Sequence, residues 1–118
     1  MSQPSVSIHP YFKVHPGKLD EARALLPDFV ARTATETTCD YYEFTINGDT
    51  IFCREAYRDA DAALAHVANV DAPLKALLAI SDLARLELHG PAAELEKLKA
   101  PLAALNPTYF EFAAGVAH

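Results

Sequence analysis

His66 is the side chain that type and spacing place best for chemistry. It follows Leu64 and precedes Val67 in a stretch with helical periodicity, at the border of the apolar stripe. An imidazole there can point into a pocket and act as a base or hydrogen-bond donor near neutral pH. Alternatively, it is a half-buried histidine that only hydrogen-bonds a carbonyl group or Glu55. Asn69, one turn on, is either a polar pocket group or a helix-end residue.

Several further polar side chains fall in segments that alternate like strands. A phenol can orient or deprotonate an aromatic substrate, although a sheet tyrosine usually packs with its hydroxyl in water. A carboxylate among apolar neighbours, as at Glu55, must be paired, and it acts as a structural ion-pair partner or as a general base. Its candidate partners are Arg54, Arg85 and His66. The sequence predicts His66 as the catalytic residue, with substrate contacts from Tyr11, Tyr42, Tyr57, Asn69, Glu55 and His9.

The histidines and cysteines do not have the spacing of a metal site. The five histidines show no His-x-His or His-x3-His pattern, and the two cysteines do not form Cys-x-x-Cys. The chain also lacks the glycine patterns of nucleotide-binding loops and of the hydrolase nucleophile elbow. We therefore expect neither a metal nor another cofactor.

Composition indicates one globular domain that spans residues 1–118. Hydrophobic residues make up 51% of the 118 residues, and the formal net charge is −6. Ten basic residues scattered among sixteen acidic ones do not favour nucleic-acid binding. No apolar stretch approaches the ~20 residues of a membrane span, and the N-terminus does not resemble a secretory signal. Cys39 and Cys53 are expected to be free thiols, and the protein is expected to be cytoplasmic and not to bind membranes.

Hydrophobic periodicity predicts the order β-α-β-β-α-β. The Asn47-Gly48 hairpin is the strongest local signal. Pro10 predicts an edge or a bulge in the first strand, and Pro27 is expected to kink or break the first helix. The expected elements are a strand at 5–14, a helix at 18–35, strands at 38–46 and 50–57, a helix at 59–70 capped by Asp59 or Asp61, its restart at 71, and a strand at 81–89.

This order is that of the α+β, ferredoxin-like fold, with a core at about 5–89. A helix at 92–105 and a short strand near 109–113 form a C-terminal appendage at about 91–116. With both core helices on one face, the sheet leaves its other face uncovered, and a second copy of the chain is expected to cover it. The appendage either adds to the partner's sheet or folds back over its own subunit. The residues expected on the uncovered face are Tyr41, Glu43, Cys53, Glu55 and Tyr57.

Three segments of the sequence, each a strand or a strand leading into a helix, follow one another in an order that is typical of a known family. A strand at 11–17 ends in Pro-Gly, a tyrosine-rich strand covers 39–44, and a strand at 54–59 leads into a helix at 62–66. Together they resemble the antibiotic biosynthesis monooxygenase family, over about residues 5–89. The resemblance implies a homodimer, a dimeric α+β barrel in which two sheets pack together, with small-molecule pockets between sheet and helices.

Members of that family differ in activity. Some oxygenate aromatic polyketides or quinols without metal or flavin, and others degrade haem. Haem degradation is not expected here, because the chain has no tryptophan and its first strand offers His9 and Tyr11 in place of an asparagine. The resemblance implies a cofactor-independent monooxygenase that acts on a small aromatic molecule of the polyphenol or quinol type, with His66 as base. The alternative is a non-catalytic dimeric module that binds a small molecule or serves in a stress response.

Overall fold

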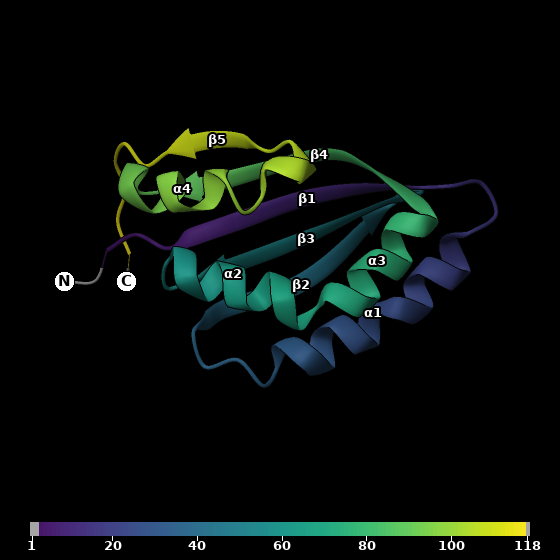
Figure 1. Ribbon diagram of the computed structural model, residues 1–118. Helices are drawn as coiled ribbons and strands as arrows, with labels where there is room; N and C mark the ends of the chain where they lie inside the picture. Colours follow the sequence, from purple (N-terminus) through teal and green to yellow (C-terminus); the bar gives the residue numbers. More distant parts are fainter. Residues whose placement is uncertain (1–2, 118) are drawn as a thin grey trace.

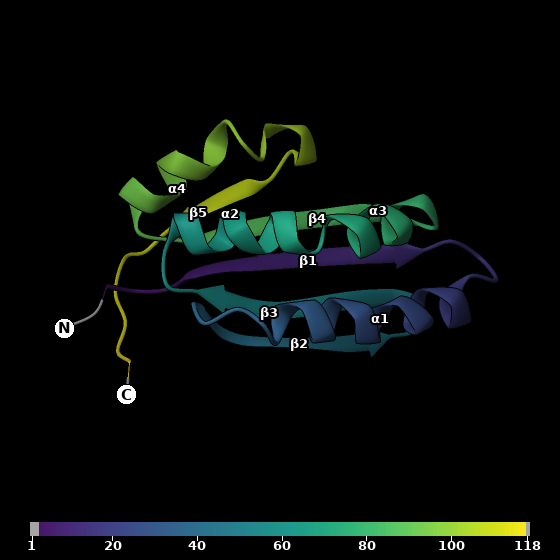
Figure 2. The same cartoon turned by 60° about the horizontal axis from the view of Figure 1, so that its bottom comes forward.

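The computed structural model describes residues 3–117. One sheet with strand order β2-β3-β1-β4-β5 forms a layer, and helices pack over one of its faces (Figures 1 and 2). In chain order the elements are β1 (Val6–Val14), α1 (Leu19–Thr33), β2 (Cys39–Asn47), β3 (Thr50–Tyr57), α2 (Ala60–Asn69), α3 (Asp71–Ala79), β4 (Ser81–Gly90), α4 (Ala92–Lys99), the 3₁₀ turn η1 (Ala103–Leu105) and β5 (Thr108–Glu111).

The predicted ferredoxin-like core is confirmed. Strands β2, β3, β1 and β4 are antiparallel neighbours, and helices α1 to α3 make the two crossovers on the same face. Within the single chain the sheet is open and does not close into a barrel. No helix among residues 3–117 has the length and apolar character needed to cross a membrane.

Local sequence signals account for most element boundaries. Gly48 has a φ of 61°, and the turn that it makes brings Asn47 opposite Thr50, as the Asn-Gly pair predicts. Asp59 caps α2, because its carboxylate accepts a hydrogen bond from the Ala62 backbone N–H at 2.9 Å.

Pro27 neither ends nor divides α1, so the break that was one of the two predicted outcomes does not occur. The helix runs without a break from Leu19 to Thr33. Pro27 and Arg23 lie on its exposed side, where water can hydrate the Arg23 carbonyl group that a proline cannot bond. Val30 lies on the exposed side as well and is 47% exposed.

Pro10 lies beside a β-bulge and not at an edge. Strand β1 is central in the sheet, and its pairing with β4 shifts by one residue between Tyr11 and Phe12. Ala84 is the extra residue of β4 at this bulge, and it is exposed.

The prediction for the uncovered face is wrong for β3. Glu55 lies directly opposite Ile8 in the β1–β3 pair, and opposite residues point to the same side of a sheet. Since Ile8 belongs to the buried face of β1, the alternate residues of β3 that include Glu55 lie beneath the helices. The residues that this places in the interior are Cys53, Glu55 and Tyr57, whereas Tyr41 and Glu43 are exposed as expected.

Both cysteines are free, as predicted. Cys53 lies opposite Phe44, and Cys39 lies opposite Tyr57. The two thiols therefore belong to well-separated rungs of the same strand pair.

The appendage folds onto its own subunit. Strand β5 pairs in parallel with β4, from Glu87 opposite Thr108 to Gly90 opposite Glu111. The expected long helix is shorter: α4 ends at Lys99, just before Pro101, and a 3₁₀ turn follows. Leu95 and Leu98 of α4 are buried against the core.

Replacing the α2 cap tests this account of the helix start. We expect Asp59→Ala to lower the free energy of unfolding by about 1 kcal/mol, because the Ala62 N–H loses its acceptor. Asp61→Ala, in the exposed first turn of the same helix, is the control and is expected to have a smaller effect. Urea unfolding followed by circular dichroism measures both, and an equal loss in the two variants would contradict the cap.

Candidate functional site

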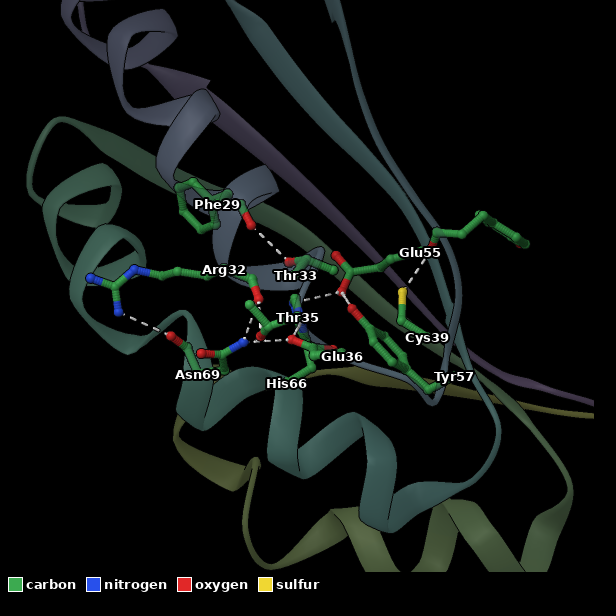
Figure 3. A network of polar contacts seen from close by, with 11 residues as sticks. Phe29, Arg32, Thr33, Thr35, Glu36, Cys39, Glu55, Tyr57, His66 and Asn69 are labelled. Carbon is green, nitrogen blue, oxygen red and sulfur yellow. Dashed lines mark hydrogen bonds and ion pairs between the residues drawn. The ribbon is translucent and has the colours of Figure 1, made fainter.

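A buried group of polar side chains lies between the sheet and helices α1 and α2 (Figure 3). His66 and Asn69 come from α2, and Glu55 and Tyr57 from β3. Glu36 comes from the loop between α1 and β2. Three segments of the chain therefore meet at one histidine.

Carboxyl groups hold both ring nitrogens of His66. Nδ1 lies 2.9 Å from Oε2 of Glu36, and Nε2 lies 3.4 Å from Oε1 of Glu55. The side chain is 3% exposed. Since a carboxylate can only accept, Nδ1 carries the proton in the neutral ring, and the Nε2 lone pair faces Glu55.

Glu36 is fixed by a bridge between α1 and α2. Asn69 Nδ2 donates to Glu36 Oε2 and to the Arg32 carbonyl oxygen, each at 2.9 Å. Arg32 Nη1 in turn donates to the Asn69 carbonyl oxygen at 3.2 Å. Within residues 3–117 the other carboxyl oxygen of Glu36, Oε1, is buried without a hydrogen-bond partner. The bridge holds the carboxyl group in place against His66.

Glu55 is a carboxyl group in an apolar interior. Tyr57 donates its hydroxyl proton to Glu55 Oε1 at 2.6 Å. Burial raises the Glu55 pKa to about 7, although hydrogen bonds from Tyr57 and Cys53 act to lower it. Near neutral pH a large fraction of Glu55 therefore carries a proton.

His66 shifts in the complementary direction. Burial lowers its pKa, and the neighbouring Glu36 opposes that change without overcoming it. When Glu55 carries its proton, the close approach of Nε2 to Glu55 is a contact between a neutral imidazole and a carboxylic acid. Such a pair can accept a proton at Nε2 and donate one from Glu55.

A cavity of about 60 Å³ lies beside these groups, between the sheet and the helices. Its polar lining consists of Tyr42, Cys53, Glu55 and His66, and the rest of its wall is apolar. One water needs ~10–15 Å³, and a cavity of ~150 Å³ holds benzene. This cavity therefore has room for a few water-sized molecules, and an aromatic ring enters only if lining side chains move. The apolar lining residues are Ile8, Pro10, Phe12, Phe29, Phe44, Val67, Val70, Leu74, Leu78, Leu83, Leu86, Leu88, Leu102 and Leu105.

The structure brings together five of the seven site residues predicted from sequence. His66, Tyr42 and Glu55 line the cavity, and the Tyr42 ring centroid lies 4.9 Å from that of His66. Tyr57 and Asn69 do not line the cavity, but they donate hydrogen bonds to Glu55 and Glu36, respectively. His9 and Tyr11 lie on the opposite face of the sheet, where Tyr11 packs on Phe52.

Sequence reasoning missed Glu36. It lies in a polar loop, Thr35-Glu36-Thr37-Thr38, where periodicity carries no information and a glutamate is ordinary. Its partner His66 is 30 residues away. Among residues 3–117 no three histidine, cysteine or acidic side chains gather closely enough to hold a metal ion.

A family model described as antibiotic biosynthesis monooxygenase matches residues 5–72, more than half of the chain. No curated protein sequence matches the chain. Among solved structures, MupZ from Pseudomonas fluorescens is 33% identical, with a TM-score of 0.91, over 97% of this chain and 94% of its own. Because that coverage omits only a few residues, the likeness extends into the C-terminal appendage.

Other solved structures share the fold at lower identity. A proposed antibiotic biosynthesis monooxygenase from Caulobacter crescentus is 24% identical, with a TM-score of 0.65, over 73% of this chain and 88% of its own. Rv0793 from Mycobacterium tuberculosis is 21% identical, also with a TM-score of 0.65, over 75% of this chain and 95% of its own. Both likenesses concern the fold alone.

The raised pKa of Glu55 predicts a specific pH dependence of stability. The pKa of Glu55 is about 7 in the folded protein and 4.5 in the unfolded chain. Its protonated form therefore stabilises the fold fully below pH 4.5, and this stabilisation is lost as the pH rises through 7. At 1.36 kcal/mol per pKa unit the loss is about 3 kcal/mol. We expect Glu55→Gln to abolish this loss, so that its unfolding free energy gains about 3 kcal/mol relative to wild type between pH 4.5 and 8.

Urea unfolding across that pH range measures the difference. The lowered pKa of His66 has the opposite effect on stability, because it reduces the free energy of unfolding as the pH falls below 6.5. Wild type and Glu55→Gln share this effect. Glu43→Gln, on the exposed side of β2, is the control and should keep the wild-type pH dependence. Parallel curves for wild type and Glu55→Gln would contradict a protonated Glu55.

Proposed function

Because this chain belongs to the antibiotic biosynthesis monooxygenase family, as its sequence motifs indicated, we propose that it is a cofactor-independent monooxygenase. Its substrate is a small aromatic molecule of the polyphenol or quinol type. One observation carries the proposal: a buried histidine, His66, is held at Nδ1 by Glu36, lies with Nε2 beside Glu55, and lines an apolar cavity together with Glu55. A carboxylate that orients an imidazole in this way is the usual arrangement of a general base.

The first step is removal of a phenolic proton. Nε2 of His66 accepts it, and the Glu36 carboxylate stabilises the resulting imidazolium through Nδ1–H. The electron-rich anion then reduces oxygen directly and forms a C–O bond at a ring carbon. A ring CH₂ group of the keto tautomer becomes C=O, the other oxygen atom leaves as water, and the substrate supplies all the electrons.

Glu55 and the apolar wall support the second step. Near neutral pH Glu55 holds a proton beside Nε2, and it can pass that proton to the oxygen that leaves as water. The Tyr57 hydroxyl group orients the Glu55 carboxyl group by donating a hydrogen bond to Oε1. The apolar lining keeps water away from the anion and from the bound oxygen.

The chain is further proposed to act as a homodimer through the uncovered face of its sheet. Aromatic rings line this face in contact with one another: Tyr11 and Phe52 at 4.7 Å between centroids, His9 and His89 at 4.5 Å, and His89 and Phe110 at 4.6 Å. A second copy would remove these rings from water. The unpaired state of both cysteines supports a reducing compartment such as the cytoplasm.

Oxygen consumption tests the catalytic proposal. With a panel of dihydroxy-aromatic compounds, we expect His66→Ala to be slower than wild type by roughly 100- to 10,000-fold, the range that general-base catalysis supplies. His15→Ala, which removes a partly exposed histidine just after β1, is the control and should retain the wild-type rate. Equal rates in wild type and His66→Ala would exclude His66 and leave a non-catalytic binding module.

Sedimentation or light scattering tests the dimer. We expect wild type to be dimeric and Phe52→Asp to dissociate roughly 100-fold or more readily, because an unpaired charge buried in an interface costs about 3–5 kcal/mol. Val30→Asp places the same charge on the exposed side of α1 and should leave the dimer intact. A monomeric wild type with native circular dichroism would contradict the proposal.

A further inference from the structure

Two leucines of the C-terminal appendage form part of the cavity wall. Leu102 follows α4 and is 5% exposed, and Leu105 ends η1 and is partly buried. Both line the cavity. The family match ends at residue 72, so this part of the wall lies outside the matched region. Figure 2 shows α4 and the turn after it beside β4 and β5, at the edge of the helix layer.

The wall is anchored on both sides. Before it, α4 buries Leu95 and Leu98 in the core cluster, and the Glu94 carboxylate accepts a hydrogen bond from the Ala60 N–H at the start of α2, at 3.0 Å. After it, β5 pairs with β4. The two leucines therefore have fixed positions and do not sit on a free tail.

The turn between these anchors has a defined shape. The Leu105 N–H donates to the Leu102 carbonyl oxygen at 3.0 Å, and the Asn106 N–H donates to that of Ala103, also at 3.0 Å. Asn106 then reverses the chain in the left-handed conformation, with a φ of 53°, which asparagine tolerates better than most residues. This geometry turns Leu102 and Leu105 inward and leaves Ala103 exposed.

The polar side chains that the sheet contributes to the cavity wall come from one half of the sheet. Tyr42, Cys53 and Glu55 belong to β2 and β3, whereas β4 and the appendage contribute only leucines. Strand β1 lies between the two halves, so β3 and β4 are ~10 Å apart at the usual strand spacing. A ligand whose hydroxyl group reaches His66 therefore extends its apolar end toward β4, Leu102 and Leu105.

We propose that Leu102 and Leu105 determine specificity, by limiting how far the fused-ring or alkyl part of a phenolic ligand extends past β4. The wall offers no hydrogen-bonding group, so it selects by size and apolar shape. The inference rests on the proposed binding of a phenol in this cavity, and it does not depend on the oxygenation step.

Calorimetric titration with phenol and 1-naphthol tests the inference in the full-length chain. We expect Leu105→Ala and Leu102→Ala to raise the affinity for 1-naphthol relative to phenol by ~10-fold or more, the range for small changes in an apolar pocket. Leu105→Phe should lower the same ratio. Leu98→Ala is the matched control: this leucine is buried in the same segment but does not line the cavity, so its loss should leave the ratio unchanged.

An unchanged ratio in both alanine variants, or an equal rise in Leu98→Ala, would overturn the inference, as would the absence of binding of either phenol to every variant. If Leu102→Ala fails to fold, the inference is tested by Leu105→Ala and Leu105→Phe, which are expected to change the ratio in opposite directions. A shifted ratio in a protein that consumes no oxygen would support the role of the leucines while the proposed monooxygenase activity fails.

Discussion

The pairing of β1 with β3 places a carboxyl group in the protein interior, and the organisation of the site follows from that constraint. Glu55 lies opposite Ile8, and this register gives it no route to solvent. An isolated buried carboxylate is costly, so it must be neutralised or hydrogen-bonded. Tyr57 donates a hydrogen bond to Glu55 Oε1, burial favours the protonated form, and His66 Nε2 lies beside the same carboxyl oxygen.

The same network joins the elements around it. From Glu55 it continues through both nitrogens of His66 to Glu36, and from there through Asn69 to the backbone of α1. A polar network of this kind adds little net stability compared with apolar packing, but it fixes one arrangement of its members. Here it fixes the tautomer and direction of a histidine beside an apolar cavity, which a purely apolar core would not provide.

The two faces of the sheet and its edge at β4 and β5 carry different groups of side chains. The covered face carries the buried acid, the histidine and the cavity, and the uncovered face carries a row of aromatic rings. At the β4 edge the appendage extends the sheet and adds leucines to the cavity wall. Since the polar groups that the sheet contributes lie on β2 and β3, the wall at β4 can vary in shape without changing the polar contacts of His66.

Local patterns in the sequence determined the order of elements and the hairpin at Asn47-Gly48, and they reduced the cap of α2 to Asp59 or Asp61, because turn chemistry and capping act within a few residues. Tertiary structure alone decided which face β3 buries. A period of two shows which residues share a face but not which face is inside, and the presence of Glu55 and Tyr57 favoured the wrong one. Tertiary structure alone also brought Glu36 to His66 and the appendage to the cavity, because contacts between distant segments leave no periodic trace in either segment.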